Sequence, residues 1–526
     1  MRQGNNSIKH IVIVGGGSAG WITAGLLAAQ HPRASGGGVD VTVIESPDVA
    51  TIGVGEGTWP TMRSTLQKIG LDEAEFLETC EASPKQGTRF HGWVNGGEDD
   101  VYYHPFSVPA GYPNAPVVPY WQAYGSDVRF AQSVSAQAQV CDHGLAPKLP
   151  SIGPNGPALN YGYHLNAGRF ADLLKTHCIE RLGVAHVLAH VQGIDGGPDE
   201  NIKGLRLANG ETLEGDLFVD CTGQAAMLIE GHYGIGLSKQ DHILFNDRAW
   251  AAQVPYASQQ SAIQSQTNAT AQKAGWVWDI GLTSRRGIGH VFSSAHSSDE
   301  EALEVLWEYL RDQAEVDLSN VSPRLLSFEP GYRERFWHRN CVAVGMSAGF
   351  IEPLEASALV MVELAAQRIA EELPPSTDTL DLVAARFNEL FGYRWARIID
   401  FIKLHYVLSQ RDDTAYWRDH RDAKSIPVRL QELLRLWAHQ VPSPRDFPQI
   451  DEIFSAASYQ YVLYGMGFKT AVRPSGDQAR QDQHVGRLLD DVARQARQLT
   501  RDLPDNRTFQ WALHQARSGQ LHAQGA

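Results

Sequence analysis

The chain has 526 residues, more than one hydrophobic core usually holds, so we expect two closely packed domains or one domain with a large addition. Its formal net charge of −15 argues against a general affinity for nucleic acid or for anionic membrane surfaces. Five cysteines are scattered without a CxxC pair, which indicates neither a disulfide framework nor a zinc site. With no apolar stretch near the roughly 20 residues of a membrane span and no signal-peptide pattern, we expect a cytoplasmic protein.

Residues 8–46 have the pattern of a βαβ unit. The run "IKHIVIV" predicts a strand, "GGGSAGWITAGLLAAQ" a glycine turn that opens a helix, and "VDVTVIES" a second strand. Gly15, Gly17 and Gly20 form a GxGxxG in the context that this motif requires. The glycines permit a tight turn, and the helix N-terminus offers N–H groups to a pyrophosphate, so we predict a dinucleotide site.

Other residues of the same unit belong to this predicted site. Ser18 and Ala19 lie inside the glycine motif, at the start of the expected helix. Glu45 ends the second strand, where it can accept hydrogen bonds from ribose hydroxyls. An acidic residue there disfavours a 2′-phosphate and therefore NADP.

Three later strand-like runs, "AHVLAHVQGI", "LEGDLFVDCTG" and "NCVAVGMSAG", predict an α/β fold with a discontinuous nucleotide domain. The second has the form of a strand that returns to the cofactor in many flavoproteins, with Asp220 and Gly223 near it, which favours FAD over NAD. The third contributes Gly345 and Gly349. Since no second glycine fingerprint is visible for a nicotinamide cofactor, a separate reductase is the simplest source of electrons.

Long helical periodicities begin after about residue 357. We therefore predict two parts. Residues 1–370 form the discontinuous FAD-binding domain, with inserted strands on the substrate side, and residues 371–526 form a mainly helical region.

The stretch "GWVWDIGL" places two tryptophans two residues apart. In a strand, Trp276, Trp278 and Ile280 share one face, and Val277 and Asp279 share the other. Paired aromatic residues more often fill a core than mark a site, so this apolar wall carries no function by itself.

Several motifs together resemble the tryptophan-halogenase family of flavin-dependent halogenases, over roughly residues 8–470. The wall resembles the family's WxWxIP signature, with glycine in place of proline, and "GVGEGTWP", with Gly53 and Gly55, is similar to a flavin-covering loop. "CEASPKQGTRF" places Lys85 at the family's catalytic lysine, and "GFIEPLEAS" places Glu355 at its catalytic glutamate. From position alone, Lys85 would be interpreted as a solvated surface lysine.

The resemblance implies a glutathione-reductase-type, Rossmann-like FAD domain and a specific chemistry. FADH2 and O2 give a flavin hydroperoxide that halide attacks, and the hypohalous acid travels to a separate aromatic site. Lys85 would hold or covalently capture it, and Glu355 would orient it or accept the ring proton. The wall would keep the flavin apart from the organic substrate.

Halide and substrate residues follow from the same resemblance. Backbone N–H groups at Ser357 and Ala358, at a helix start, would bind chloride or bromide. His104 and Phe106 in "YYHPF", with Tyr459, would lie on the substrate side. The expected partners are a small electron-rich aromatic molecule, such as an indole, and an NAD(P)H-dependent flavin reductase; a homodimer is also considered. We expect no metal.

Two alternatives stay open on the sequence alone. A flavin-dependent aromatic hydroxylase shares the fold, but it usually carries a GD motif where this chain has Met346. A flavin-binding protein without turnover is consistent with Ala356, Ala358 and Gly281, where the chain departs from the family pattern.

Overall fold

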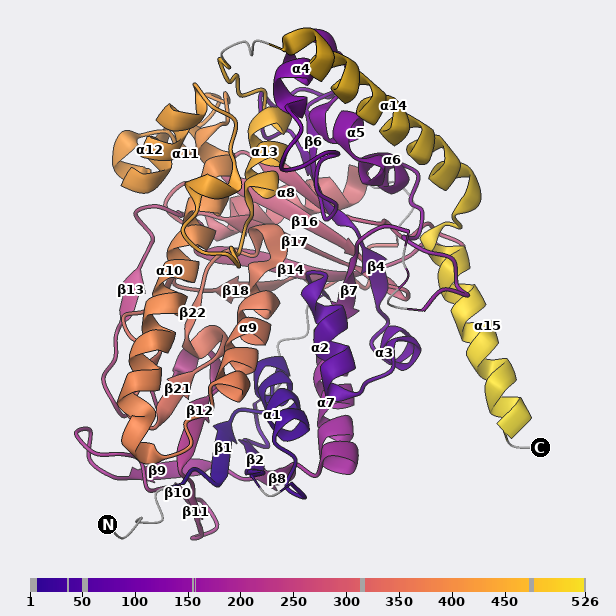
Figure 1. Ribbon diagram of the computed structural model, residues 1–526. Coiled ribbons are helices and arrows are strands. Elements are labelled where there is room, and N and C mark those ends of the chain that lie inside the picture. Colours follow the sequence, from indigo (N-terminus) through magenta and orange to yellow (C-terminus); the bar gives the residue numbers. More distant parts are fainter. Residues whose placement is uncertain are drawn as a thin grey trace.

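The computed structural model describes residues 7–35, 37–49, 55–153, 156, 158–312, 317–472 and 477–524, and the backbone alone for 517–524. A six-stranded sheet, in the order β20-β21-β12-β1-β2-β8, lies in the lower part of Figure 1. All its pairings are parallel except that of β20 with β21. Its strands are β1 (His10–Val14), β2 (Asp40–Glu45), β8 (Ala185–Leu188), β12 (Leu217–Asp220), β20 (Trp337–His338) and β21 (Cys341–Ala343).

The βαβ unit predicted from the sequence is present as β1, α1 (Ser18–Gln30) and β2. Every residue of β1 after His10 is buried, as expected for a central parallel strand covered on both faces. Helix α1 packs against α7 (Ala167–Leu182) and α9 (Ser357–Glu371), which lie beside it in Figure 1. The start of α9 is thereby brought to the same end of the molecule as the glycine turn.

A second, seven-stranded sheet occupies the upper part of the molecule, in the order β18-β14-β17-β16-β15-β5-β6. Only the pairing of β15 with β5 is parallel. Its strands are β5 (Gly87–His91), β6 (Val101–Pro105), β14 (Arg248–Pro255), β15 (Thr267–Gln272), β16 (Gly275–Gly281), β17 (Arg285–Phe292) and β18 (Arg324–Ser327). Helix α8 (Asp299–Asp312) packs against β17 and β14.

Three smaller sheets complete the strands of the described residues. One, in the order β3-β7-β4, includes part of the predicted flavin loop, residues 55–57. It contains β3 (Gly55–Gly57), β4 (Ser83–Lys85) and β7 (Gly162–Asn166). The others are β9 (Val191–Asp195), β10 (Gly204–Leu207) and β11 (Thr212–Glu214), and β13 (Leu237–Lys239), β19 (Gly331–Arg333) and β22 (Gly349–Phe350).

The chain is mainly helical from α9 onward, as predicted. The helices that follow it are α10 (Leu380–Val407), α11 (Ala415–Asp419), α12 (Val428–Trp437), α13 (Ala456–Gly465), α14 (Gln478–Asp502) and α15 (Asn506–Gln524). Earlier ones are α2 (Thr61–Ile69), α3 (Glu73–Thr79), α4 (Val117–Tyr124), α5 (Phe130–Val134) and α6 (Ala136–Asp142). The expected α/β fold, Rossmann-like with a helical C-terminal region, is confirmed.

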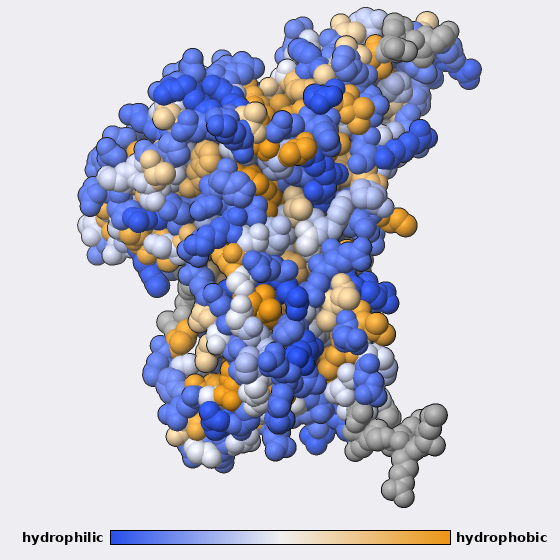
Figure 2. All heavy atoms as spheres, turned by 90° about the vertical axis from the view of Figure 1, so that its left-hand side faces the viewer, coloured by the Kyte–Doolittle hydropathy of each residue, from blue (hydrophilic) through white to orange (hydrophobic). Residues whose placement is uncertain are grey.

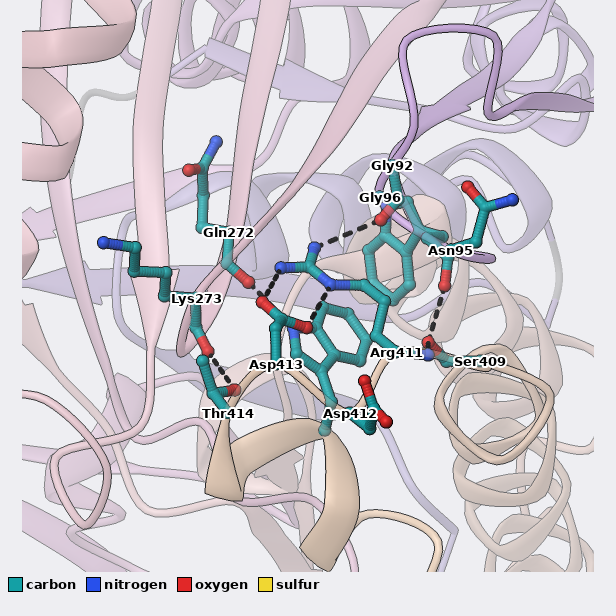
Figure 3. A network of polar contacts seen from close by, with 12 residues as sticks. Gly92, Asn95, Gly96, Gln272, Lys273, Ser409, Arg411, Asp412, Asp413 and Thr414 are labelled. Carbon is teal, nitrogen blue, oxygen red and sulfur yellow. Dashed lines mark hydrogen bonds and ion pairs between the residues drawn. The ribbon is translucent and has the colours of Figure 1, made fainter.

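A polar clamp fixes the end of α10 to the seven-stranded sheet (Figure 3). The Arg411 guanidinium donates to Asp413 at 2.7 and 3.0 Å and to the Gly92 carbonyl at 3.1 Å. The Thr414 hydroxyl donates to the Lys273 carbonyl at 2.7 Å, in the turn between β15 and β16. The last turn of α10 is therefore held against strands that are distant in sequence.

One face of the molecule is mainly hydrophilic, with hydrophobic residues in small separate groups (Figure 2). Among the described residues, no helix is both long and apolar enough to cross a membrane.

Candidate active site

The glycine turn before α1 is built to exclude side chains. Gly15 has φ +116°, and a Cβ on it would lie 2.2 Å from the Cys221 carbonyl oxygen. A Cβ on Gly20 would lie 1.9 Å from the Gly15 oxygen. Gly17 caps α1 without any side-chain hydrogen bond, and no atom lies within 4 Å of its Cβ position. The first N–H groups of α1 therefore face open space, which fits a pyrophosphate.

Of the other glycines predicted to bind the cofactor, Gly345 lies beside this turn, and Gly223 lies beside the segment of Gly345. Gly345, with φ +76°, comes so close to α1 that a Cβ on it would lie 2.8 Å from that of Ala19. Gly223 has φ +67° and open space beside it. Gly349 lies in β22 and Gly55 in β3, whereas Gly53 lies outside the described residues.

The two acidic residues predicted near the nucleotide have partners within the protein. Glu45 ends β2 as expected, and its carboxylate accepts from Lys175 and, at 2.8 Å, from His186. Asp220 is buried, and its oxygens accept from the backbone and hydroxyl of Thr222 and from two further N–H groups, those of Leu228 and Ile229. Asp220 therefore fixes the turn that begins at Gly223.

Glu355 and Ala356 form a strained turn directly before α9. Both have left-handed backbones, with φ of +68° and +54°. Non-glycine residues in this region cost of order 1–3 kcal/mol each and cluster at functional sites. α9 begins at Ser357 without a side-chain cap, Ser357 is buried and Ala358 is exposed. The start of this 15-residue helix thus offers backbone donors to an anion.

The Glu355 carboxylate lies between two imidazoles. His104 Nδ1 on β6 is 2.9 Å from Oε2, and His405 Nε2 on α10 is 3.3 Å from Oε1. The Tyr102 hydroxyl lies 2.6 Å from His405 Nδ1. Burial by itself raises the pKa of Glu355, but His104 and His405 outweigh burial and hold that pKa at about 2. The side chain is therefore a carboxylate at neutral pH.

Lys85 is buried, not solvated: the residue is 1% exposed, at the end of β4. Its Nζ lies 5.6 Å from the centre of the Phe106 ring. A Cβ on Gly57 would be 3.0 Å from Nζ and 3.4 Å from the Ala356 Cβ, so the amine lies beside the Glu355–Ala356 turn. Burial lowers the pKa of Lys85 to about 8, although Glu355 opposes this shift.

The two tryptophans form the wall that alternation predicts. Trp276 and Trp278 contact each other at 6.4 Å between ring centres and belong to the main core with Ile280, whereas Val277 packs in the cluster around α8. Ile280 Cγ2 lies 3.8 Å from the Cβ position of Gly55 in β3. The wall therefore adjoins β3, which is part of the predicted flavin loop.

Hydrogen bonds tie the wall strand to the two other segments of the site. The Gly281 carbonyl accepts from the Ser83 hydroxyl at 2.6 Å, two residues before Lys85. Trp276 Nε1 donates to Glu352 Oε2 at 2.7 Å. β16, β4 and the segment before α9 are thus fixed relative to one another.

Glu352 is a residue of the site that sequence reasoning missed. Besides Trp276, the Asn246 amide and the Tyr406 hydroxyl donate to the same oxygen, each at 2.7 Å. Burial raises the pKa of Glu352 despite these donors. The signal in the sequence was its place in "GFIEPLEAS", three residues before Glu355. Trp59, whose Nε1 donates to the Glu355 carbonyl at 2.8 Å, was also missed.

Aromatic rings lie around His104. Phe401, Phe454 and Tyr461 lie 5.5, 6.4 and 6.2 Å from its ring centre. Tyr459, predicted on the substrate side, lies one layer further out. Its ring is fully buried and packs on Phe401 at 5.0 Å, on Trp437 and on Phe447.

A dinucleotide turn in the same chain as a buried amine beside a buried carboxylate fits a flavin-dependent enzyme. Comparison with known proteins makes the assignment specific. Residues 10–481 match the family model described as tryptophan halogenase. The chain belongs to the tryptophan-halogenase family, whose members are flavin-dependent halogenases.

Curated and solved relatives agree with this membership. Tryptophan 6-halogenase SttH from Streptomyces toxytricini is 32% identical over 88% of this chain and 90% of its own length. The crystal structure of a tryptophan halogenase from Shewanella frigidimarina NCIMB 400 has a TM-score of 0.92 and 46% identity, covering 97% of this chain and 98% of that one. BrvH, a flavin-dependent halogenase from Brevundimonas sp. BAL3, has a TM-score of 0.84 and 32% identity, over 96% and 99% of the two chains.

Family membership implies the cofactor FAD with O2 and a halide, an aromatic substrate, and a separate flavin reductase. Metal-binding groups of three or more His, Cys, Asp or Glu side chains are not found in the described part of the chain.

Proposed function

We propose that this protein halogenates an electron-rich aromatic substrate of the indole type, using reduced FAD, O2 and chloride or bromide, with Lys85 as the residue that receives the oxidised halogen. The observation that carries the proposal is the state of Lys85. A buried amine with a pKa near 8, beside a carboxylate held at a pKa near 2, is suited to chemistry at nitrogen.

The proposed FAD site lies at the N-terminus of α1. Its residues are Gly15, Gly17, Ser18, Ala19, Gly20, Glu45, Gly53, Gly55, Asp220, Gly223, Gly345 and Gly349. The open space beside Gly17 and the close approach of Gly345 to α1 support it. When bound and reduced, FAD supplies with O2 the two-electron oxidation of halide to hypohalous acid. The division into residues 1–370 for the FAD domain and 371–526 for the helical region remains part of this proposal.

The halide site that we propose is the start of α9. The backbone N–H groups of Ser357 and Ala358 are the donors, because the helix has no side-chain cap there. Alanine at 356 and 358 leaves those backbone donors intact. The first turn of α9 adjoins the same Gly57 and Ala356 positions that lie close to the Lys85 amine.

Lys85 and Glu355 then act in sequence on the halogen and the substrate. The neutral Lys85 amine holds HOX by a hydrogen bond, or reacts with it to give an N–X bond and water. The aromatic carbon attacks the halogen, a C–X bond forms, and the O–X or N–X electron pair stays on oxygen or nitrogen. Glu355 accepts the proton lost from the ring carbon and returns it to that oxygen or nitrogen, so the carboxylate and the Lys85 amine are restored and the net products are the aryl halide and water.

The wall of Trp276, Trp278 and Ile280 is proposed to separate the flavin from the organic substrate. It is fixed by the Glu352 carboxylate and by the packing of Ile280 against β3. A fixed barrier favours halide oxidation over hydroxylation because it keeps the ring away from the flavin.

The substrate is proposed to lie against His104 and Phe106, with Tyr461 and Phe454 beyond them and Tyr459 supporting Phe401 from behind. The name of SttH describes a tryptophan 6-halogenase and that of RebH from Lentzea aerocolonigenes a tryptophan 7-halogenase, which supports an indole ring here. An NAD(P)H-dependent flavin reductase is the proposed electron source. The homodimer and the cytoplasmic location stay predictions.

The test supplies the protein with FAD, a flavin reductase, NADH and either bromide or chloride, together with a panel of indoles and phenols. We expect products with the halogen isotope pattern in mass spectrometry, and none from Lys85→Ala with FAD binding retained. Hydroxylated products would support the hydroxylase. Absence of turnover, with Lys85→Ala indistinguishable from the parent, would support a flavin-binding protein.

A further inference from the structure

Glu355 has a second imidazole partner that the proposed reaction does not yet use. His405 Nε2 and Glu355 Oε1 lie 3.3 Å apart, within ion-pair distance but not aligned as a hydrogen bond, and neither atom makes a hydrogen bond to any described residue. Both side chains are at most 4% exposed, so water does not take the place of a partner. Two buried polar atoms that have only each other are expected to interact.

The His405 ring cannot turn away from this contact. It is stacked on Phe90 at 4.7 Å between ring centres and meets Phe401 edge-on at 5.4 Å. It lies in the last turn of α10, which the Arg411 clamp of Figure 3 fixes to the sheet. The imidazole is therefore locked with Nε2 toward Glu355 and Nδ1 toward Tyr102.

The hydrogen-bond directions along this chain follow from the protonation of its ends. Burial raises the pKa of Tyr102 well above its usual value, so its hydroxyl keeps its proton and donates to His405 Nδ1. Burial also lowers the pKa of His405, so the ring is neutral. A neutral ring that accepts at Nδ1 carries its proton on Nε2, which then points at the Glu355 carboxylate.

We propose that Tyr102 and His405 form a positioning relay, in which the tyrosine hydroxyl fixes the tautomer of His405 and His405 Nε2–H holds the Glu355 carboxylate in place from the side opposite His104. The relay rests on the proposed function, in which Glu355 accepts the ring proton, and it adds the residues that position Glu355 for that step. Its consequence is that Glu355 is ionised and in one orientation when the ring proton is released.

Four groups from three elements act on the charge of Glu355 in the described part of the chain. They are Lys85 on β4, Tyr102 and His104 on β6, and His405 on α10. Of the two histidines, His104 lies 2.9 Å from Oε2 and His405 lies 3.3 Å from Oε1. Removing His405 takes away its share in lowering the pKa of Glu355, so that pKa rises by about one to two units.

The test uses His405→Phe, which keeps the ring volume but not the donor, and His405→Gln, whose amide can donate to Glu355 and accept from Tyr102. Tyr102→Phe removes only the hydroxyl that sets the tautomer. Tyr103→Phe is the matched control, because its hydroxyl donates to Asp142 instead. We expect His405→Phe to lower kcat roughly tenfold or more with KM little changed, and to move the acid limb of the kcat profile upward by about one to two pH units. His405→Gln should recover part of both, and Tyr103→Phe should change neither.

A second readout needs neither flavin nor turnover. In apoprotein with 13C-labelled glutamate carboxyls, the Glu355 resonance is assigned by its loss in Glu355→Gln and followed with pH. We expect no titration above about pH 4 in the parent and a measurable one in His405→Phe. Unchanged titration and an unchanged acid limb in His405→Phe would overturn the relay. If the parent yields no halogenated product while His405→Phe still shifts the titration, the proposed function is wrong and the relay stands.

Discussion

Replacing Lys85 with methionine is expected to make the protein more stable and inactive at the same time. The side chain is buried, and its pKa is about 8 in the folded protein against 10.5 in the unfolded chain. That difference, at about 1.36 kcal/mol for each pKa unit, corresponds to about 3 kcal/mol by which folding disfavours the charged amine. Methionine has a similar length and no charge, so it removes this penalty.

The sign of the pH dependence is fixed by the order of the two pKa values. Because the folded value is the lower one, the unfolded chain binds the extra proton between about pH 8 and 10.5, and the stability of the parent rises through that window. The penalty is complete below pH 8. Lys85→Met should therefore exceed the parent by about 3 kcal/mol at pH 7 and by about 1 kcal/mol at pH 10.

Urea unfolding of the apoproteins at pH 7, 8, 9 and 10 measures this difference, and product analysis measures the activity. Lys424→Met, at an exposed position, is the control for loss of a lysine as such. A difference between Lys85→Met and the parent that does not change with pH would show that the amine is not desolvated. Halogenated product from Lys85→Met would refute the role of the amine.

Three further predictions address the cofactor turn, the wall and a buried carboxyl. Gly17→Ala should weaken FAD binding by roughly tenfold, about 1.4 kcal/mol, in fluorescence titrations. The melting temperature of its apoprotein should not change, because the added Cβ meets only open space. Gly15→Ala should fail to fold stably, because residue 15 has a φ of +116°. Trp276→Phe deletes one of the three donors to Glu352 Oε2 and should cost about 1–3 kcal/mol of unfolding free energy in urea. Burial raises the pKa of Glu363 from 4.5 to about 7, so the parent loses stability as the pH rises through that window. Between pH 5 and 8, the unfolding free energy of Glu363→Gln should therefore increase relative to that of the parent by up to about 3 kcal/mol in the same assay.

Short sequence patterns predicted the βαβ unit, the wall strand and the C-terminal helices, because each of these elements is marked by residues close together in the sequence. Gly15, Gly17 and Gly20 lie between a β-branched run and a helix, so the motif can be recognised within about 20 residues, although the atom that leaves no room for a side chain on Gly15 is the distant Cys221 carbonyl oxygen. The alternation of Trp276 with Val277 assigned the two faces of β16 correctly because a strand has a strict period of two. The long helices after residue 357 followed from their apolar periodicity in the same way.

The position of Tyr459 shows what such patterns do not predict, which is the direction in which a buried helical side chain points. Tyr459 and Tyr461 lie two residues apart, and in α13 that spacing turns their side chains by about 200°, onto opposite faces. Both are buried, so burial does not distinguish them. Tyr461 reaches toward His104, whereas Tyr459 packs against Phe401 and Trp437. The rotation of the helix decides this, and it depends on packing with segments far away in the sequence.

The site's two buried carboxylates depend on the same kind of distant contact. Glu352 and Glu355 lie three residues apart, and successive residues of α10 contact them: Tyr406 donates to Glu352, and His405 meets Glu355. One helix end thus holds both the carboxylate behind the wall and the one beside Lys85. The apolar periodicity of α10 does not distinguish His405 and Tyr406 from other buried helix positions. Their roles could not be predicted from it, because their partners Glu355 and Glu352 lie about 50 residues earlier in the chain. A small shift of that helix end would disturb the wall and the proton acceptor together, so the clamp that fixes it to the sheet serves both halves of the proposed reaction.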